Sequence, residues 1–172
     1  MSGPPRPGRP GGAALDRARA IERFGPGRTF TLVFTNGCFD LLHEGHRALL
    51  RHAASLGDRV VVGLNSDASV RRLKGPGRPA TTEAERARGL LALDEVDAVM
   101  VFDEDTPLAL IEALLPDVLV KGADYALEDI VGRELVEARG GRVERVPLVP
   151  GVSTSALLDE GGEPNDTGEP HG

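Results

Sequence analysis

The sequence has little of what marks disulfide-rich, membrane-spanning or nucleic-acid-binding proteins. Its 172 residues include a single cysteine, Cys38, so no disulfide can form within the chain and a reducing compartment, the cytoplasm, is expected. No apolar run is long enough to span a bilayer or to form the core of a signal peptide, so we expect no membrane partner. The formal net charge of -7 disfavours a general nucleic-acid binder, which normally presents a basic surface.

Short motifs of several enzyme classes are missing as well. The sequence contains no G-x-S-x-G, Ser-x-x-Lys or H-E-x-x-H arrangement, so neither a covalent nucleophile nor a zinc site is expected. It also lacks a Walker A loop and the G-x-G-x-x-G fingerprint, which makes a nicotinamide-dependent dehydrogenase a poor fit. The residues therefore predict no metal site on the protein itself.

What the sequence does contain is an alternation of short β-rich runs and helical patterns. Strands separated by single helices predict parallel pairing, and hence an α/β fold with a doubly wound, five-stranded parallel sheet. We expect one domain over residues 13–159, with disordered Pro- and Gly-rich tails at 1–12 and 160–172. The predicted strands are 31–35, 59–64, 98–102, 117–121 and 142–149, and the predicted helices are 13–24, 43–56, 68–73, 82–93, 106–115 and 130–139.

The stretch TLVFTNGCFDLLHEGH combines a strand, a glycine turn and a helix start. The strand is expected to break at Asn36-Gly37, and the leucine pattern that follows places His43 and His46 one turn apart at the start of a helix. A helix N-terminus carries unpaired N–H groups and partial positive charge, which favours a small anion such as a phosphate. Two solvated surface histidines, or half of a metal site, are the alternatives for His43 and His46.

Lysine is almost absent from the sequence, which has 18 arginines but only the lysines Lys74 and Lys121. Lys74 opens a Pro- and Gly-rich loop, and with Arg78 and the preceding arginines it predicts an electrostatic lid over a polyanionic small molecule. The alternative is an ordinary solvated run of charge. Arg86 follows a capping box formed by Thr82 and Glu85 and could point back toward this lid.

The second lysine follows the fourth predicted strand. Ligands of open parallel sheets lie beyond the carboxyl ends of the strands, so Lys121, Asp124 and Tyr125 are expected on the same edge as the two histidines. An ordinary loop after a strand is the alternative. A glycine followed by Ser153-Thr154 predicts a second phosphate cradle at a helix start, although simple N-capping would explain this pattern nearly as well.

This set of groups suits a direct phosphoryl-type transfer, because hydrogen-bond donors and cations abound and no nucleophile is present. At this point the sequence resembles a known family. TNGCFDLLHEGH is similar to the signature of the H-x-G-H nucleotidyltransferase superfamily. NSDASVRRLKGPGRPATTEAER, FDEDTPLALIEALLPDVLVKGADY and GVSTS follow in the order typical of D-glycero-β-D-manno-heptose 1-phosphate adenylyltransferases, and the likeness runs from about residue 14 to 158.

The resemblance implies a Rossmann-like fold and a reaction in which ATP and heptose 1-phosphate give ADP-heptose and pyrophosphate. It implies Mg²⁺ held largely by the nucleotide phosphates, a separate upstream heptose kinase and a possible homodimer. It also implies roles for individual residues, which fall into three groups. The catalytic residues are His43, His46 and Lys74; the nucleotide-binding residues are Thr35, Asn36, Gly37, Cys38, Phe39, Gly45, Lys121, Ser153 and Thr154; and the substrate-binding residues are Asp40, Arg78, Arg86, Asp124 and Tyr125.

Other functions remain open from the sequence. A cytidylyltransferase or guanylyltransferase for another sugar or polyol phosphate is one alternative, because no residue reads the nucleobase. Glycerol-phosphate cytidylyltransferases, however, carry an arginine where this chain has Leu148. A regulatory module that binds a nucleotide without turnover is the alternative from another class, and the intact His43 and His46 argue against it.

Overall fold

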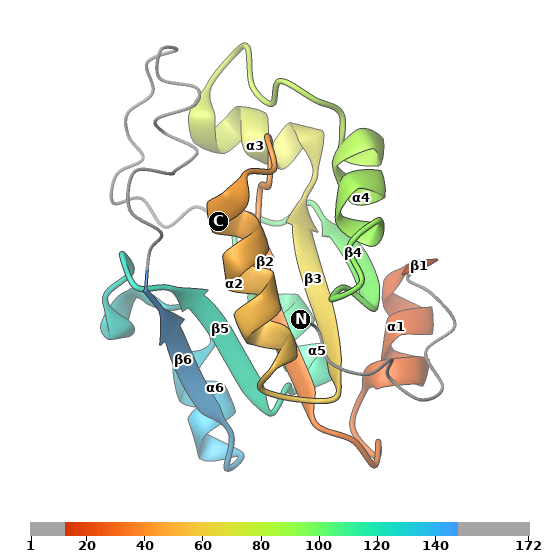
Figure 1. Ribbon diagram of the computed structural model, residues 1–172, viewed down its shortest axis with the longest axis vertical. Coiled ribbons are helices and arrows are strands. Elements are labelled where there is room, and N and C mark those ends of the chain that lie inside the picture. The colour runs from red at the N-terminus through yellow and green to blue at the C-terminus, as the bar shows by residue number, and fades with distance from the viewer. Residues whose placement is uncertain (1–12, 148–172) are drawn as a thin grey trace.

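Alternating β-branched and helix-forming segments build one parallel sheet with helices on both faces, as Figure 1 shows for this computed structural model. The structure describes residues 13–147. Its strands are β1 (Ala13–Ala14), β2 (Leu32–Gly37), β3 (Arg59–Asn65), β4 (Ala98–Phe102), β5 (Val118–Gly122) and β6 (Arg142–Val146). Its helices are α1 (Arg17–Phe24), α2 (Glu44–Ala54), α3 (Asp67–Lys74), α4 (Glu83–Leu91), α5 (Leu108–Leu114) and α6 (Arg133–Ala138), with a short 3₁₀ turn η1 (Leu127–Asp129).

The strand order is β1-β4-β3-β2-β5-β6, and every neighbouring pair is parallel. The predicted α/β fold with its five parallel strands is therefore confirmed. The two-residue strand β1 is an addition at the edge beside β4, in a segment that the sequence predicts as helix. Helix α1 begins only at Arg17, because the Asp16 side chain accepts a hydrogen bond from the Arg19 N–H and caps the helix there.

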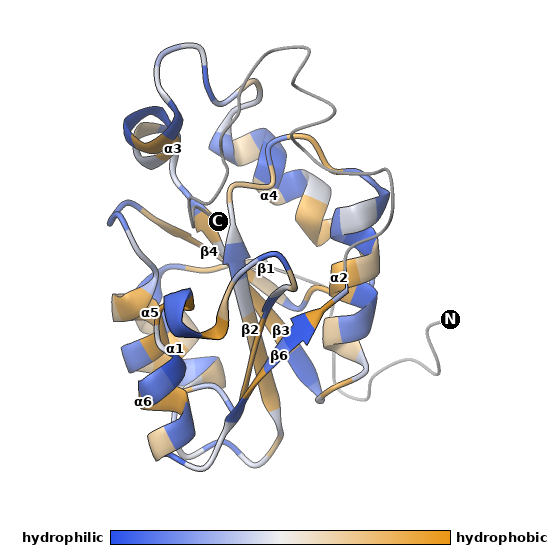
Figure 2. Cartoon of the chain, turned by 90° about the vertical axis from the view of Figure 1, so that its left-hand side faces the viewer, coloured by the Kyte–Doolittle hydropathy of each residue, from blue (hydrophilic) through white to orange (hydrophobic). Residues whose placement is uncertain are grey.

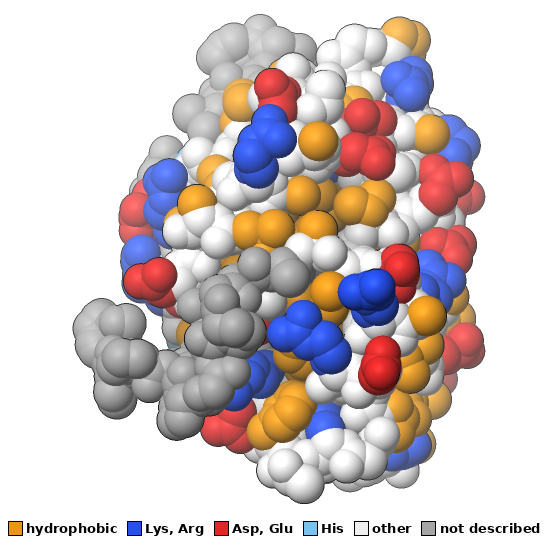
Figure 3. Space-filling model, turned by 90° about the vertical axis from the view of Figure 1, so that its right-hand side faces the viewer, with side chains coloured by type: hydrophobic (Ala, Val, Ile, Leu, Met, Phe, Trp, Pro, Cys, Tyr) orange, Lys and Arg blue, Asp and Glu red, His pale blue; other side chains and the backbone are white. Residues whose placement is uncertain are grey.

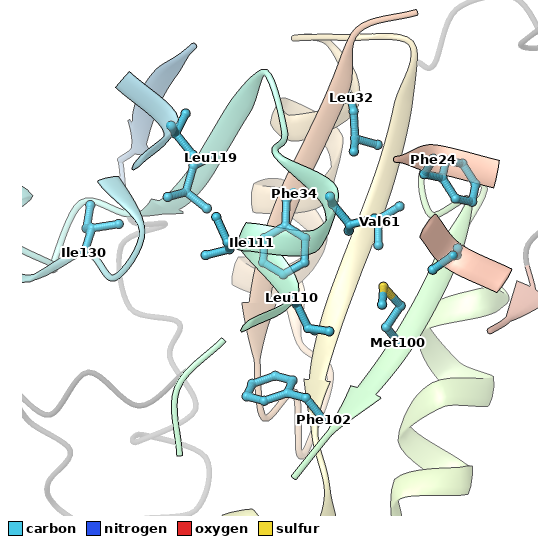
Figure 4. Close-up of a cluster of buried hydrophobic side chains, with 14 residues drawn as sticks. Phe24, Leu32, Phe34, Val61, Met100, Phe102, Leu110, Ile111, Leu119 and Ile130 are labelled. Atoms are coloured by element: carbon cyan, nitrogen blue, oxygen red, sulfur yellow. The ribbon is translucent and has the colours of Figure 1, made fainter. Parts of the chain in front are cut away.

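Two apolar clusters, one on each face of the sheet, hold the helices in place. One face packs against α1, α5 and α6 around Phe34, Val61 and Leu110 (Figure 4). The other packs against α2 and α4 around Val62 and Leu90. The helices accordingly carry both hydrophobic and hydrophilic residues, whereas the central strands are mostly hydrophobic (Figure 2). This is the doubly wound arrangement expected from the sequence.

Strand β2 runs further than the sequence predicts. It continues through Asn36 and Gly37, which pair with Gly63 and Leu64 of β3, so the predicted break at Asn36-Gly37 is wrong. Glycine at 63 leaves room for the Phe34 ring, because a Cβ there would lie 2.8 Å from the end of that ring. The extension carries the chain to the carboxyl edge of the sheet before it turns toward α2.

The predicted helix over 130–139 is shorter in the structure. Gly132, with a φ of 90°, adopts a left-handed conformation and separates the 3₁₀ turn η1 from α6. The predicted tails at 1–12 and 160–172, the end of the fifth predicted strand and the Ser153-Thr154 cradle lie outside the described residues.

Acidic and basic side chains alternate among apolar ones on the described part of the face that carries α1 and α4 (Figure 3). This face shows no broad basic surface of the kind that a general nucleic-acid binder presents. Within residues 13–147, none of the helices has the length and apolar character needed to cross a membrane.

Candidate functional site

His43 is the N-cap of α2, as the sequence predicts for the start of this helix. Its Nδ1 accepts hydrogen bonds from the backbone N–H groups of Gly45 and His46, at 3.0 and 3.4 Å. In return, His46 Nδ1 accepts from the backbone N–H of His43 at 3.4 Å, which completes a capping box built from two imidazoles. The histidines are thus fixed by the end of the helix that they cap.

These hydrogen bonds assign the tautomer of both rings. Because each Nδ1 accepts an N–H, the proton of each neutral imidazole resides on Nε2. The two rings stack with centroids 3.9 Å apart and an angle of 18° between their planes. The site therefore places the two imidazoles side by side at the carboxyl edge of the sheet, where the Leu41 backbone also hydrogen-bonds the His46 ring.

Both imidazoles are held in the neutral form. Burial, followed by the electrostatic effects of His43 and Lys74 on the protonated ring, lowers the pKa of His46 to about 3. Burial, and then Arg47, lowers the pKa of His43 as well. At neutral pH the pair acts through hydrogen bonding, and the positive charge of the site comes from other side chains.

Lys121 brings one such charge to the edge, from the end of β5 beside β2. Its ammonium donates to the backbone oxygen of Asn36 at 3.0 Å and lies 4.5 Å from the centre of the Tyr125 ring. The side chain is only 6% exposed, and burial lowers its pKa to about 8 against the opposing effect of Asp124. A buried ammonium without a carboxylate in contact within the described chain is well placed to meet an anion.

We expect the burial of Lys121 to appear as a pH-dependent difference in stability between the wild type and Lys121→Met. The folded pKa of about 8 lies below the unfolded value, so the native state binds fewer protons than the unfolded chain between about pH 8 and 10.5. The wild type should therefore gain stability relative to the variant as pH rises through this window, by on the order of 1–3 kcal/mol. Urea unfolding at pH 7.5 and pH 10 measures this difference, and an unchanged difference would contradict the burial argument.

Arg86, predicted to contact substrate, bonds protein groups in this structure. Its side chain is buried and donates to the backbone oxygens of Cys38 and Asn65, both at 2.8 Å, and to that of Thr81 at 3.2 Å. It also forms an ion pair with Asp67 at 2.7 Å. Arg86 thus joins the ends of β2 and β3 to the start of α3, and its contact with substrate stays a prediction.

Asp40 has a similar role on the other side of the turn. Its carboxylate accepts hydrogen bonds from the N–H groups of Ala80 and Thr81, at 2.7 and 3.0 Å, and from the Thr81 hydroxyl at 2.9 Å. Asp40 is only 4% exposed. The far end of the predicted lid is therefore fastened to the turn that precedes α2, and substrate binding by Asp40 stays a prediction.

Lys74 is the last residue of α3 and is partly buried. Its charge acts on both Cys38 and His46, so α3 carries this lysine close to the histidine pair. Arg78 is also partly buried, whereas Arg72 is exposed and pairs with Asp105 at 3.1 Å. The structure thus brings Lys74 to the site, while Arg72 is engaged by acidic neighbours.

The remaining predicted residues divide between the turn and the strand ends. Thr35 is buried and donates from its hydroxyl to the backbone oxygen of Val120 at 2.8 Å, which ties β2 to β5. The Cys38 thiol is buried among Lys74, Arg86 and Lys121, and burial raises its pKa despite these cations. The other predicted residues at this edge are Asn36, Gly37, Phe39, Gly45, Asp124 and Tyr125, and their roles toward ligands stay predictions.

Sequence reasoning missed two residues that support the site. Asp67, in the first turn of α3, forms the ion pair with Arg86. Asn65 offers its backbone oxygen to the same guanidinium and its side-chain Nδ2 to Ser69 Oγ at 2.9 Å. The contacts with Arg86 join residues 21 and 19 positions apart, so nothing in the local spacing signals them.

A family described as Cytidylyltransferase-like matches residues 34–157 of the chain. Among curated proteins, the Bifunctional protein HldE of Citrifermentans bemidjiense is 63% identical over 129 residues, which cover 75% of this chain and 26% of that protein. The Bifunctional protein HldE of Mesorhizobium japonicum is 64% identical over 125 residues, or 73% of this chain and 25% of that protein. The chain thus spans about a quarter of the length of these relatives.

Solved structures share the fold. The lipopolysaccharide core biosynthesis protein from Thermoplasma volcanium GSS1 matches with a TM-score of 0.57 and 25% identity, over 70% of this chain and 98% of that one. Pantothenate synthetase from Thermus thermophilus matches with a TM-score of 0.59 and 18% identity, over 85% of this chain and 67% of that one. The second likeness concerns the fold alone.

Proposed function

The chain belongs to the cytidylyltransferase-like family of nucleotidyltransferases, and on that premise we propose that it transfers AMP from ATP to D-glycero-D-manno-heptose 1-phosphate. The products would be ADP-heptose and pyrophosphate. Identities of 63% and 64% to proteins named HldE support this choice of reaction, and so does the resemblance of the sequence to heptose 1-phosphate adenylyltransferases. The lipopolysaccharide core biosynthesis protein with the same fold agrees with a sugar product for a surface glycan.

The observation that carries the proposal is the pair of stacked imidazoles that cap α2. Both Nε2–H donors lie where a parallel sheet of this kind binds its ligand, and Lys121 and Lys74 supply positive charge nearby. Donors held in advance of the reaction can follow the charge that develops on a phosphate in the transition state. This arrangement suits transfer between phosphates better than hydride transfer or covalent catalysis.

We propose a direct displacement. A phosphate oxygen of the sugar 1-phosphate forms a bond to the α-phosphorus of ATP, and the bond from that phosphorus to the bridging oxygen breaks. Pyrophosphate leaves with the electron pair of the broken bond. His43 and His46 would donate through Nε2 to phosphate oxygens that gain charge, while Lys74 and Lys121 offset the charge of the polyphosphate.

Mg²⁺ is part of this proposal as an ion that arrives with the nucleotide. No group of three or more His, Cys, Asp or Glu residues able to hold a metal occurs within residues 13–147. Mg²⁺ commonly binds through substrate phosphates and one or two carboxylates, and the exposed Asp124 at the strand edge is a carboxylate whose charge acts on Lys121. When bound, the ion would neutralise part of the charge on the phosphates.

The relatives are named bifunctional and are much longer than this chain, so the activity proposed here concerns only the shared region. The separate upstream kinase, the homodimer and the cytoplasmic location stay predictions. Three alternatives to the proposed reaction remain: a different nucleobase, a different sugar or polyol phosphate as acceptor, or nucleotide binding without turnover.

The decisive experiment measures pyrophosphate release with Mg²⁺ while ATP, CTP and GTP are each combined with both anomers of heptose 1-phosphate and with glycerol 3-phosphate. We expect release with ATP and one heptose anomer. Release with CTP or GTP instead would assign another base, and release with glycerol 3-phosphate would assign another acceptor. Nucleotide binding without release in any combination would overturn the proposal in favour of a binding module.

A further inference from the structure

Phe39 has a backbone conformation that its side chain does not favour. Its φ is 46°, and the only other non-glycine residue with a positive φ within the described chain is Leu115. Leu115 ends helix α5 as its left-handed C-cap, a common place for this conformation. Phe39 ends no helix. Its conformation is unfavourable for a residue with a side chain and calls for a compensating role.

The ring of Phe39 shows what the conformation achieves. It is only 6% exposed and lies against the His46 ring, with centroids 5.1 Å apart and an angle of 58° between the planes. His46 also stacks against His43, with centroids 3.9 Å apart. We call these three rings the ring stack, in which His46 contacts both of the others.

The ring stack limits both the orientation and the solvation of His46. Its imidazole contacts both Phe39 and His43, while its Nδ1 accepts the backbone N–H of His43. The charged and polar groups that act on it come from Lys74 of α3, His43 and Arg47 of α2, and the Leu41 backbone. Phe39 is the apolar member of this environment.

We propose that Phe39 is a positioning residue, whose ring clamps the His46 imidazole against His43 so that His46 keeps one tautomer and one orientation. A nucleotide-binding role for the backbone of this turn does not require an aromatic ring at position 39. Packing in the apolar core does not require it either, because a residue that only fills space has no need of a left-handed backbone. The proposal deepens the proposed function, since it assigns a role in preparing the phosphate donor.

The test uses the ligand-free chain and NMR spectra of its histidine side chains. Phe39→Leu removes the ring and keeps an apolar side chain, whereas Phe39→Tyr keeps the ring. In the wild type and in Phe39→Tyr we expect His46 to remain neutral, with its proton on Nε2, down to about pH 5. In Phe39→Leu, water reaches the imidazole, so its pKa should rise by about one unit or more and the second tautomer should appear.

Phe24→Leu is the matched control, because Phe24 is also buried but belongs to the cluster on the other face of the sheet. It should lose stability without a change in the His46 titration. If Phe39→Leu fails to fold, Phe39→Met takes its place, since the flexible methionine side chain fills irregular space without a ring. An unchanged His46 titration and tautomer in a folded variant without the ring would overturn the proposal.

Kinetics supply an independent second reading. With ATP and heptose 1-phosphate, Phe39→Leu should lower kcat by about tenfold, with a smaller change in KM, because the misplaced donor acts on the transition state. The loss should deepen at acidic pH, where His46 of the variant takes up a proton. If the wild type itself releases no pyrophosphate, the proposed function fails, whereas the NMR result still decides the role of Phe39.

Discussion

The His46→Ala variant should fold normally and lose about 10²- to 10³-fold in kcat, the usual effect of removing one donor to the transition state. The variant lacks the Nε2–H of His46 and the stacking of that ring on His43. The Gly45 N–H still donates to His43 Nδ1, so this part of the α2 cap remains. KM for ATP should change much less than kcat, because the lost hydrogen bond strengthens as charge develops. Steady-state pyrophosphate release, with circular dichroism to check folding, measures both effects.

His52→Ala provides the control on the same helix. His52 is exposed in the last turn of α2, so its removal should leave kcat within about twofold of the wild type. A His46→Ala variant with wild-type turnover would remove this histidine from the mechanism. A variant with normal kcat and a strongly raised KM would instead show that His46 contributes equally to the ground state and the transition state.

The sequence predicts the order of strands and helices well, because the apolar periodicity reports burial directly. The strand around Val60, the capping box at Thr82 and the helix start at His43 are all confirmed. The break at Asn36-Gly37 was predicted wrongly because turn propensity is a local preference, whereas pairing with β3 extends the strand across both residues. Strand β1 depends on its β4 partner in the same way.

The sequence allows some of the candidate site residues to be placed, but it does not reveal their contacts. His43, His46 and Lys121 could be placed at one edge, since parallel strands end together. Spacing alone could not show that the Nδ1 of each imidazole accepts a hydrogen bond from the backbone N–H of the other histidine. This pair of hydrogen bonds fixes the tautomers. Nor could it show that Arg86 bonds carbonyl oxygens from three segments, because a buried arginine and a substrate-facing arginine look alike in a sequence.

Arg86→Met should destabilise the fold by about 3–5 kcal/mol, since the change removes one partner of a buried ion pair and of several hydrogen bonds. The methionine leaves the backbone oxygens of Cys38 and Asn65 without their donor and Asp67 without its cation. Arg86→Lys should recover only part of this loss, because a lysine cannot reproduce the fork of donors that an arginine presents. Urea unfolding at pH 7 gives the free energy of unfolding for each variant.

Arg88→Met is the matched control, because Arg88 lies on the same helix but is exposed, and it should cost less than about 0.5 kcal/mol. The Asp67→Asn change should cost less in the Arg86→Met background than in the wild type, since the ion pair is already broken there. If Arg86→Met instead keeps wild-type stability and only weakens sugar-phosphate binding, Arg86 faces the substrate, as the sequence predicts. The stability measurement therefore separates an arginine that builds the site from one that binds within it.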